Sequence, residues 1–142
     1  MKYVLDTNHL SLLEWDNADS LTLQMRLDTV PPETVMTTIV NYEEQMRGWL
    51  ERAARASTAE QLRATYSRLE QHIQTFADVP LLSFDARAAA HFERLQTTKV
   101  RIGTMDLKIA AIALANDATV LTRDTGHFSK IPGLKYADWS GL

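Results

Sequence analysis

A chain of 142 residues with 45% hydrophobic and 23% charged residues has the size and composition of one globular domain, which we expect to span residues 1–142. It contains no cysteine, and this excludes disulfide bonds, thiolate metal sites and cysteine nucleophiles. No signal-peptide pattern opens the chain and no apolar run is long enough to cross a membrane, so we expect a cytoplasmic protein without a membrane partner.

The formal charge is slightly acidic, with 15 Lys and Arg residues against 18 Asp and Glu residues. A protein that binds nucleic acid usually presents a basic face, so this balance argues against such a partner. If four of the acids are metal ligands, however, the remaining surface has 14 acids against 15 bases. The net charge therefore does not exclude a nucleic-acid substrate.

Predicted strands and helices alternate along the chain. In chain order we expect a strand at 2–5, helices at 8–15 and 20–27, a strand at 34–39, helices at 41–55 and 58–77, a strand at 80–84, helices at 85–96 and 104–116, a strand at 118–122 and a short edge strand at 134–136. Such alternation is typical of an α/β fold with a mainly parallel sheet.

The segment at 97–103 tests this parallel arrangement. The preceding helix, at 85–96, is about 18 Å long at ~1.5 Å per residue and returns the chain to the bottom of the sheet. The next helix must begin at the top if it is to deliver the strand at 118–122 in parallel. Seven extended residues span about 23 Å, and the sequence TTKVRIG has no helix signal. The predicted topology is therefore geometrically feasible.

Four acidic residues fall where the carboxyl ends of the predicted strands meet. Asp6 ends the first strand and Asp124 follows the fourth. Glu44 lies in the first turn of the helix after the second strand, and Asp106 begins the last long helix. Active sites of parallel α/β sheets lie beyond this edge. We also expect the first and fourth strands to be adjacent, because a central first strand is common in doubly wound sheets.

Each acid also has a purely structural interpretation. Asp6 can cap the helix that follows it, and Asn41 and Glu44 have the spacing of a capping box. Asp106 can lie in a first helical turn, where the helix dipole favours negative charge, and Asp124 can be a turn residue. Carboxylates gathered at one edge, however, repel one another unless cations lie between them. Their oxygens suit Mg²⁺ or Mn²⁺ rather than Zn²⁺.

Four sequence blocks occur in a fixed order over nearly the whole chain. They are VLDTN, TTIVNYEEQMRGW, MDLKIAAIALANDATVLTRD and HFSKIPGLKYADW. Together they resemble the blocks of the PIN-domain ribonucleases, and most closely those of the VapC-type toxins of bacterial toxin–antitoxin pairs. The first block contains Asp6, and the register of the second selects Glu44 over Glu43. The third block contains Asp106 and Asp124.

This resemblance implies a PIN-like three-layer α/β/α sandwich with a mainly parallel sheet of four to five strands. It implies an endoribonuclease that depends on Mg²⁺ or Mn²⁺, in which the ions orient and deprotonate a water, polarise the scissile phosphate and stabilise the leaving oxygen. The implied partners are an RNA substrate, an antitoxin whose C-terminal segment covers the acidic groove, and a second copy of the chain in a homodimer.

The resemblance also assigns roles to individual acids. Asp6, Glu44 and Asp106 are expected to hold the principal ion. Asp124 is expected to hold a second ion or a bound water. Many relatives have Asn at the position of Asp124 and an acid at the position of His127, so here the fourth acid must come from Asp124.

Four neighbours of these acids have expected supporting roles. Asn8 and Thr122 would orient the carboxylates. Arg101 and Arg123 flank ligand segments and would steady RNA phosphates, although a surface salt bridge explains each arginine equally well.

Two other classes of protein fit part of the pattern. A phosphoacceptor receiver domain also gathers acids above a parallel sheet, but it needs adjacent acids after the first strand and a late Lys-Pro pair. This chain has the single Asp6 and the sequence Lys130-Ile131-Pro132 at those places. A catalytically inactive PIN-like scaffold that binds RNA or protein is the second alternative, and the presence of all four acids argues against it.

Overall fold

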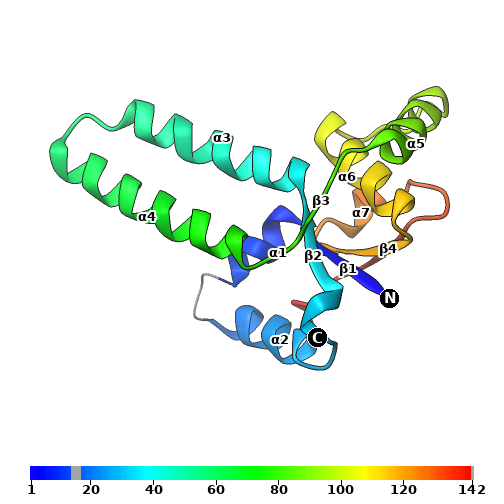
Figure 1. Cartoon of the computed structure of the whole chain (residues 1–142), viewed down its shortest axis with the longest axis horizontal. Helices are drawn as coiled ribbons and strands as arrows, with labels where there is room; N and C mark the ends of the chain where they lie inside the picture. Colours follow the sequence, from blue (N-terminus) through cyan, green and yellow to red (C-terminus); the bar gives the residue numbers. More distant parts are fainter. Residues whose placement is uncertain (14–16, 142) are drawn as a thin grey trace.

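The sheet has its first strand at the centre. The structure, a computed structural model, describes residues 1–13 and 17–141. The strands in these residues are β1 (Lys2–Leu5), β2 (Val35–Thr38), β3 (Leu81–Leu82), β4 (Ala118–Leu121) and β5 (Lys135–Ala137). They form one parallel sheet in the order β3-β2-β1-β4-β5 (Figure 1). The predicted adjacency of the first and fourth strands is confirmed.

Helices cover both faces of this sheet. They are α1 (Thr7–Leu12), α2 (Ala18–Leu27), the 3₁₀ helix η1 (Pro32–Thr34), α3 (Ile39–Arg55), α4 (Ala59–Ala77), α5 (Ala86–Thr97), α6 (Thr104–Ala115) and α7 (Thr125–Phe128). α5 and α6 lie on one face, and α1 and α2 lie on the other, while α3 and α4 form a hairpin that projects away from the sheet (Figure 1). The predicted three-layer α/β/α sandwich is confirmed.

Successive residues of the central strands point into opposite layers of the sandwich. Val4 and Val120 pack in the core that contains α5 and α6. Leu5 and Leu121 pack in the core that contains α1, α2 and Phe76 of α4. Because side chains alternate across a strand, a strand covered on both faces is apolar at every position. The last two residues of β1 and of β4 are accordingly apolar and buried, and the first polar residues beyond them, Asp6 and Thr122, lie at the carboxyl edge of the sheet.

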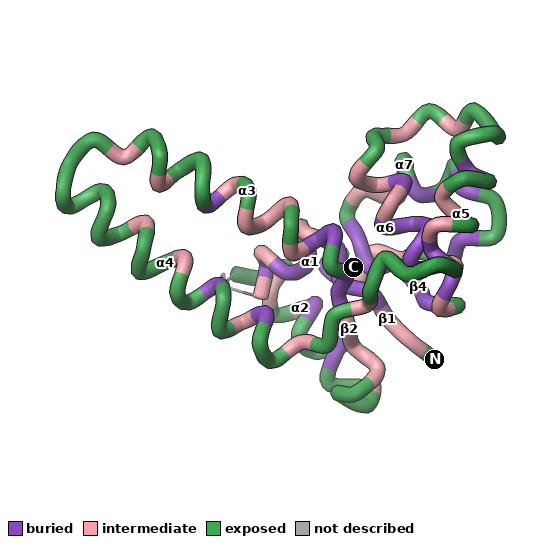
Figure 2. The backbone as a smooth tube through the Cα atoms, turned by 45° about the horizontal axis from the view of Figure 1, so that its top comes forward, coloured by how far each residue is buried: buried purple, intermediate pink, exposed green. Residues whose placement is uncertain are grey.

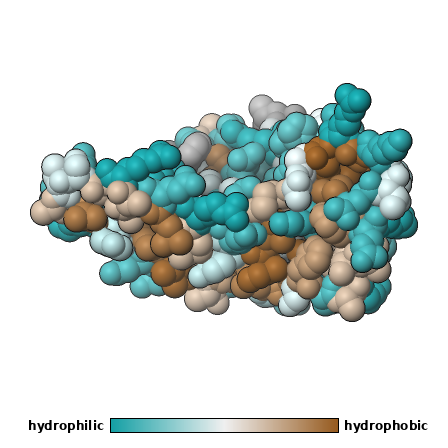
Figure 3. Space-filling view, turned by 90° about the horizontal axis from the view of Figure 1, so that it is seen from above, coloured by the Kyte–Doolittle hydropathy of each residue, from teal (hydrophilic) through white to brown (hydrophobic). Residues whose placement is uncertain are grey.

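Helix α6 is apolar around its whole circumference because it lies between the sheet and α5. Figure 2 shows buried positions concentrated in β1, β4 and α6, whereas the far half of the α3–α4 hairpin is mostly exposed. Seen from above, that hairpin carries hydrophilic side chains interleaved with hydrophobic ones (Figure 3, left). The packing of α6 fixes the position of its first turn, which contains Asp106.

The start of α3 was predicted two residues too late. The side-chain oxygen of Thr38 accepts a hydrogen bond from the backbone N–H of Asn41 at 3.0 Å, so Thr38 ends β2 and caps the helix that begins at Ile39. The predicted strand at 34–39 is shortened for the same reason. Glu44 consequently lies in the second turn of α3, not in the predicted first turn.

Other boundaries differ by small amounts. α2 begins at Ala18 because Asn17 caps it, and the predicted end of the first helix at Trp15 lies outside the described residues. The strand predicted at 80–84 is reduced to β3, since β2 offers only Thr37 and Thr38 as partners. The last strand lies one residue later than predicted, and α7 and η1 were not predicted.

The connection between α5 and α6 allows the strand after α6 to be parallel to β1, as predicted. α5 ends at Thr97, and Gly103 is the N-cap of α6. The strand that follows α6 pairs in parallel with β1, from Lys2 opposite Ala118 to Leu5 opposite Leu121. Within the described residues, no helix combines the length and the apolar character that a membrane crossing needs.

Candidate active site

Asp6 occupies the first position after β1, at the carboxyl edge of the sheet. Its carboxylate is buried and accepts three hydrogen bonds. The donors are the backbone N–H of Thr7 at 2.8 Å, the side-chain amide of Asn41 at 3.0 Å and the hydroxyl of Thr122 at 3.0 Å. Asp6 is also the N-cap of α1, but it accepts from the first N–H of that helix rather than from the second or third. Capping alone therefore does not explain its two side-chain donors.

Burial raises the pKa of Asp6 to about 6, from an ordinary value of 3.8. The hydrogen bonds from Thr7, Thr122 and Asn41 lower this pKa, and the negative charge of Asp106 raises it further. A buried carboxylate near a second carboxylate lacks a counter-charge. This electrostatic deficit is what a bound cation would relieve.

Glu44 reaches the same edge from α3. Its Oε1 accepts a short hydrogen bond from the hydroxyl of Thr7. The amide of Asn41 donates to Thr7 Oγ1 at 3.2 Å as well as to Asp6, and Asn41 Oδ1 accepts from the hydroxyl of Thr38 at 2.7 Å. One chain of hydrogen bonds thus connects the carboxylate that ends β1 with the carboxylate on α3.

Asp106, Asp124 and His127 form the other side of the site. Each offers one possible ligand atom, and these three atoms lie within 4.8 Å of one another. Nδ1 of His127 lies 2.9 Å from Asp124 Oδ2 and 3.3 Å from Asp106 Oδ2. Burial raises the pKa of Asp106, and the charges of Asp124 and Glu44 raise it further, against the lowering effect of His127.

Thr122 joins the two sides. It is fully buried one residue after β4. Its hydroxyl donates to Asp6 Oδ2 and accepts the backbone N–H of Asp124 at 2.9 Å. The predicted supporting role of Thr122 therefore has a specific geometry in the structure.

The two arginines that were predicted to contact RNA make other contacts in the structure. Arg123 forms a short ion pair with Asp19 of α2 and donates to Ser140 Oγ at 2.9 Å, which favours the salt-bridge interpretation. Arg101 is exposed, and its carbonyl oxygen accepts from Lys130 Nζ at 3.3 Å.

Asn8 is exposed on α1, where it lines a hollow with Arg123. Its predicted place beside the carboxylates is taken by Thr7 and Asn41, which the sequence reasoning missed. Asn41 was interpreted only as a capping residue. Its position three residues before Glu44, on the same face of α3, is the signal that indicates a site role.

The donor set fits a hard divalent cation. Four carboxylates converge, two of them with raised pKa values that favour neutralisation by a cation. Carboxylate oxygens suit Mg²⁺ and Mn²⁺, and one imidazole nitrogen is compatible with Mn²⁺ and the later transition metals. The described residues at this edge can therefore hold a metal ion.

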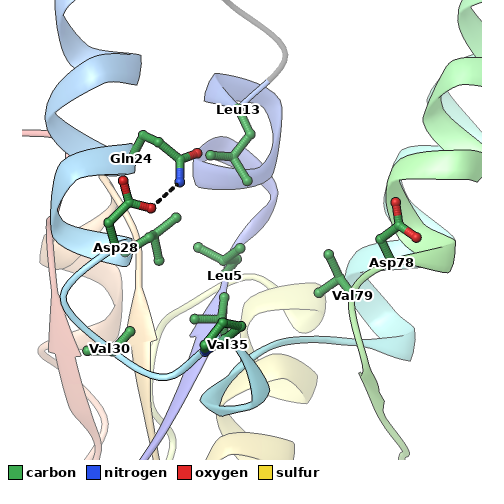
Figure 4. A pocket seen from close by; sticks show the side chains of 10 residues that line it. Leu5, Leu13, Gln24, Asp28, Val30, Val35, Asp78 and Val79 are labelled. Carbon is green, nitrogen blue, oxygen red and sulfur yellow. Dashed lines mark hydrogen bonds between the residues drawn. The ribbon is translucent and has the colours of Figure 1, made fainter.

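A hollow of about 390 Å³ lies away from these acids, on the α1 and α2 side of the sheet (Figure 4). Leu5, Val35 and Val79 are among its lining residues, and beside it Gln24 donates to Asp28 at 2.9 Å. Within the described chain, none of the four candidate acids lines it. Its wall is mainly apolar, and its two carboxylates, Asp28 and Asp78, are not among the acids at the carboxyl edge of the sheet.

Comparison with known proteins decides the family. Residues 3–134 match the model of the PIN domain. The chain belongs to the PIN-domain family. Membership places the chain among proteins that act as nucleases. No curated protein sequence matches it.

Several solved structures share this PIN fold over almost the whole chain. FitAcB from Neisseria gonorrhoeae is 28% identical, with a TM-score of 0.72 and 99% of each chain covered. VapBC-1 from nontypeable Haemophilus influenzae is 22% identical, with a TM-score of 0.76, covering 99% of this chain and 100% of that one. A toxin–antitoxin complex from Klebsiella pneumoniae is 18% identical, with a TM-score of 0.71 and all of both chains covered. The predicted resemblance to VapC-type PIN toxins is confirmed.

Proposed function

We propose that this PIN-domain protein is a Mg²⁺- or Mn²⁺-dependent endoribonuclease and the toxin of a type II toxin–antitoxin pair. One observation carries the proposal. Asp6, Glu44, Asp106 and Asp124 converge at the carboxyl edge of the sheet, and the pKa values of Asp6 and Asp106 are raised. Burial, and to a smaller extent the neighbouring carboxylates, disfavour the charged forms of these acids, and a bound hard cation would offset this cost.

In this proposal Asp6, Glu44 and Asp106 hold the principal ion, and Asp124 holds a second ion or a water. His127 lies against Asp106 and Asp124 and adds a nitrogen ligand on that side. A bound divalent cation would supply Lewis-acid activation of water and of the scissile phosphate.

The protein's own contribution is to fix the orientation of the carboxylates. Asn41 donates to Asp6 Oδ1 and Thr122 donates to Asp6 Oδ2, so both oxygens of Asp6 have a set direction. Thr7 holds Glu44 in the same way. Ligands that are already oriented do not have to be ordered when the substrate binds.

The RNA substrate is inferred from the ribonucleases that the four sequence blocks resemble. The antitoxin partner is inferred from the structural neighbours, since one of them is a toxin–antitoxin complex. We extend the same inference to a homodimer. An antitoxin segment that covers the acidic edge would block access of RNA to the carboxylates.

The test is cleavage of a mixed RNA pool in the presence of Mn²⁺. Asp6→Asn and Asp106→Asn should each abolish cleavage and leave the circular dichroism spectrum unchanged. Wild-type rates in both variants would refute the assignment of the site. If the wild-type protein neither binds Mn²⁺ nor cuts RNA, the alternative of a catalytically inactive scaffold is correct.

A further inference from the structure

Two arginines of the α3–α4 hairpin are held against one tryptophan. Trp49 of α3 has 8% of its surface exposed, and its ring lies 6.0 Å from that of His72 on α4, between centroids. The guanidinium carbon of Arg52 lies 4.5 Å from the ring centroid of Trp49, and that of Arg68, from α4, lies 5.7 Å from it. Stacking on an aromatic face fixes a guanidinium group and leaves its N–H edge available.

These two guanidinium groups differ from the other arginines of the hairpin. Arg47, Arg55 and Arg63 each pair with a glutamate three or four residues away on the same helix. Among the described residues, neither Arg52 nor Arg68 has a carboxylate partner. The sequence thus neutralises three positive charges locally and leaves two concentrated at Trp49.

A polar hollow connects Trp49 and Arg52 with Glu44, one of the proposed catalytic acids. It has a volume of about 210 Å³ and is lined by Thr7 and Glu44 at one end and by Trp49 and Arg52 at the other. Glu44, Gly48 and Arg52 are spaced four residues apart and so share one face of α3 over about 12 Å. The space beside Gly48 is open, since a Cβ atom at that position would meet nothing within 4 Å.

We infer that Arg52 and Arg68 bind a phosphate of the RNA strand beside the one that is cleaved. The inference deepens the proposed ribonuclease function and rests on it. A strand whose scissile phosphate lies at Glu44 and Asp106 has to leave the site along an open path, and the hollow on α3 is such a path. A guanidinium N–H edge matches phosphate oxygens in charge and geometry, and a contact to phosphate holds the strand without reading its sequence.

Binding of a short fluorescein-labelled oligouridylate, measured by fluorescence anisotropy in EDTA so that cleavage is suppressed, tests this site. The double variant Arg52→Gln/Arg68→Gln should bind about tenfold more weakly than wild type. Its slope of log Kd against log salt concentration should fall by about 0.7, the value for one phosphate on a single strand. The paired Arg55, changed to Gln, is the matched control and should change Kd by less than about twofold.

A second variant tests the path without changing any charge. Gly48→Met should weaken binding because the side chain fills the hollow, while helix propensity improves and folding is not impaired. If wild type binds the oligouridylate and both altered proteins bind equally well, the phosphate site is wrong and the proposed function is unaffected. If wild type does not bind the oligouridylate, the phosphate site is wrong, and the proposed function is decided separately by RNA cleavage in the presence of Mn²⁺.

Polyglutamate distinguishes RNA from an acidic protein segment as the occupant. It should compete poorly with the oligouridylate at equal charge concentration, because the site is proposed to hold the phosphates of an extended nucleic-acid strand, whose spacing the carboxylates of a polypeptide do not reproduce. Polyglutamate that displaces the RNA from wild type, and binds the double variant more weakly, would assign the two arginines to a protein partner instead and overturn the RNA assignment.

Discussion

The hydroxyl of Thr122 donates a hydrogen bond to Oδ2 of Asp6 across the boundary between β4 and β1, with 3.0 Å between the oxygens. The same hydroxyl accepts the backbone N–H of Asp124. A single buried side chain therefore orients one proposed ligand and the backbone of another. The contact with Asp6 depends on the register that sets Leu5 opposite Leu121, whereas the contact with Asp124 is local to the turn after β4.

Replacement of Thr122 by valine keeps the side-chain shape and removes both hydrogen bonds. We expect Thr122→Val to lower the free energy of unfolding by about 1–2 kcal/mol, because a buried carboxylate and a backbone N–H lose partners. Mn²⁺ affinity should fall about 10- to 100-fold, as is usual when a residue that orients a ligand is lost. Urea unfolding and Mn²⁺ titration measure the two effects. Thr119→Val, in the same strand, is the control and should leave Mn²⁺ affinity unchanged.

Asp6 should make the metal-free protein less stable as pH rises. Its pKa is about 6 in the folded state against 3.8 ordinarily, so between these values the folded state holds a proton that the unfolded state has released. Stability is therefore greatest below about pH 4 with respect to this group and is lost as pH rises to about 6. The loss is about 3 kcal/mol.

Urea unfolding in EDTA at a series of pH values measures this dependence. Asp6→Asn removes the titrating group, so this variant should equal wild type near pH 4 and exceed it in stability at pH 7.5. Parallel stability curves for the two proteins would show that the folded environment does not raise the pKa of Asp6.

The charge on Asp106 should likewise destabilise the metal-free fold, because burial and two neighbouring carboxylates oppose its ionisation. Asp106→Asn should melt about 3 °C higher than wild type in EDTA and gain less stability from added Mn²⁺. If Asp106 acted only through a favourable interaction with the helix dipole, Asp106→Asn would have a lower melting temperature in EDTA and an unchanged response to Mn²⁺.

A true capping aspartate provides the comparison for that melt. Asp85 accepts a hydrogen bond from the backbone N–H of Ala88 at 3.0 Å and caps α5. Asp85→Ala should lower the stability by about 1 kcal/mol and leave the response to Mn²⁺ as in wild type. The two aspartates should thus change the melting temperature in opposite directions.

Adjacent glutamates on α3 should differ sharply in their effect on cleavage. Glu44 accepts from Thr7 at the site, whereas Glu43 pairs with Arg47 on the exposed surface. Glu44→Gln should lower the cleavage rate by at least about 100-fold, and Glu43→Gln by less than about twofold. The reverse order of effects would show that the helix presents its other face to the substrate.

The imidazole of His127 should tune which metal the site prefers. Nitrogen ligands favour the later transition metals over Mg²⁺. His127→Asp should therefore weaken Ni²⁺ binding about tenfold and leave Mg²⁺ binding equal or tighter, in calorimetric titrations. His91→Asp on α5, whose histidine lies 2.7 Å from Arg94, is the control. Equal changes for both metals would mean that His127 does not contact the ion.

Asp6, Asp106 and Asp124 could be placed at one edge from the fold class, whereas the choice of Glu44 over Glu43 needed the family resemblance. Asp6 and Asp124 come after apolar strands that must lie inside a parallel sheet, and such strands end at one edge. Asp106 could be placed because TTKVRIG is long enough to bring the chain back to that edge. These inferences need only local pattern and chain geometry.

Contacts between segments that are far apart along the chain could not be predicted from the sequence. Asn41 reads as a capping residue from its neighbours, and its burial against Asp6 depends on how α3 sits on the sheet. Arg123 pairs with Asp19, 104 residues away, which no local pattern reveals. The extent of β3 was limited by its neighbour β2, since a strand pairs only as far as its partner continues.

Because β4 lies late in the chain, it is translated long after β1 and Asp6. Asp6 emerges from the ribosome early, but its donor Thr122 follows 116 residues later. Until β4 has been translated and inserted beside β1, the nascent polypeptide has no Thr122 to hold Asp6 and no Asp124 beside Asp106. Pairings between segments so far apart form slowly and last in folding. Nuclease competence should therefore arise only after β4 has been translated and has paired with β1.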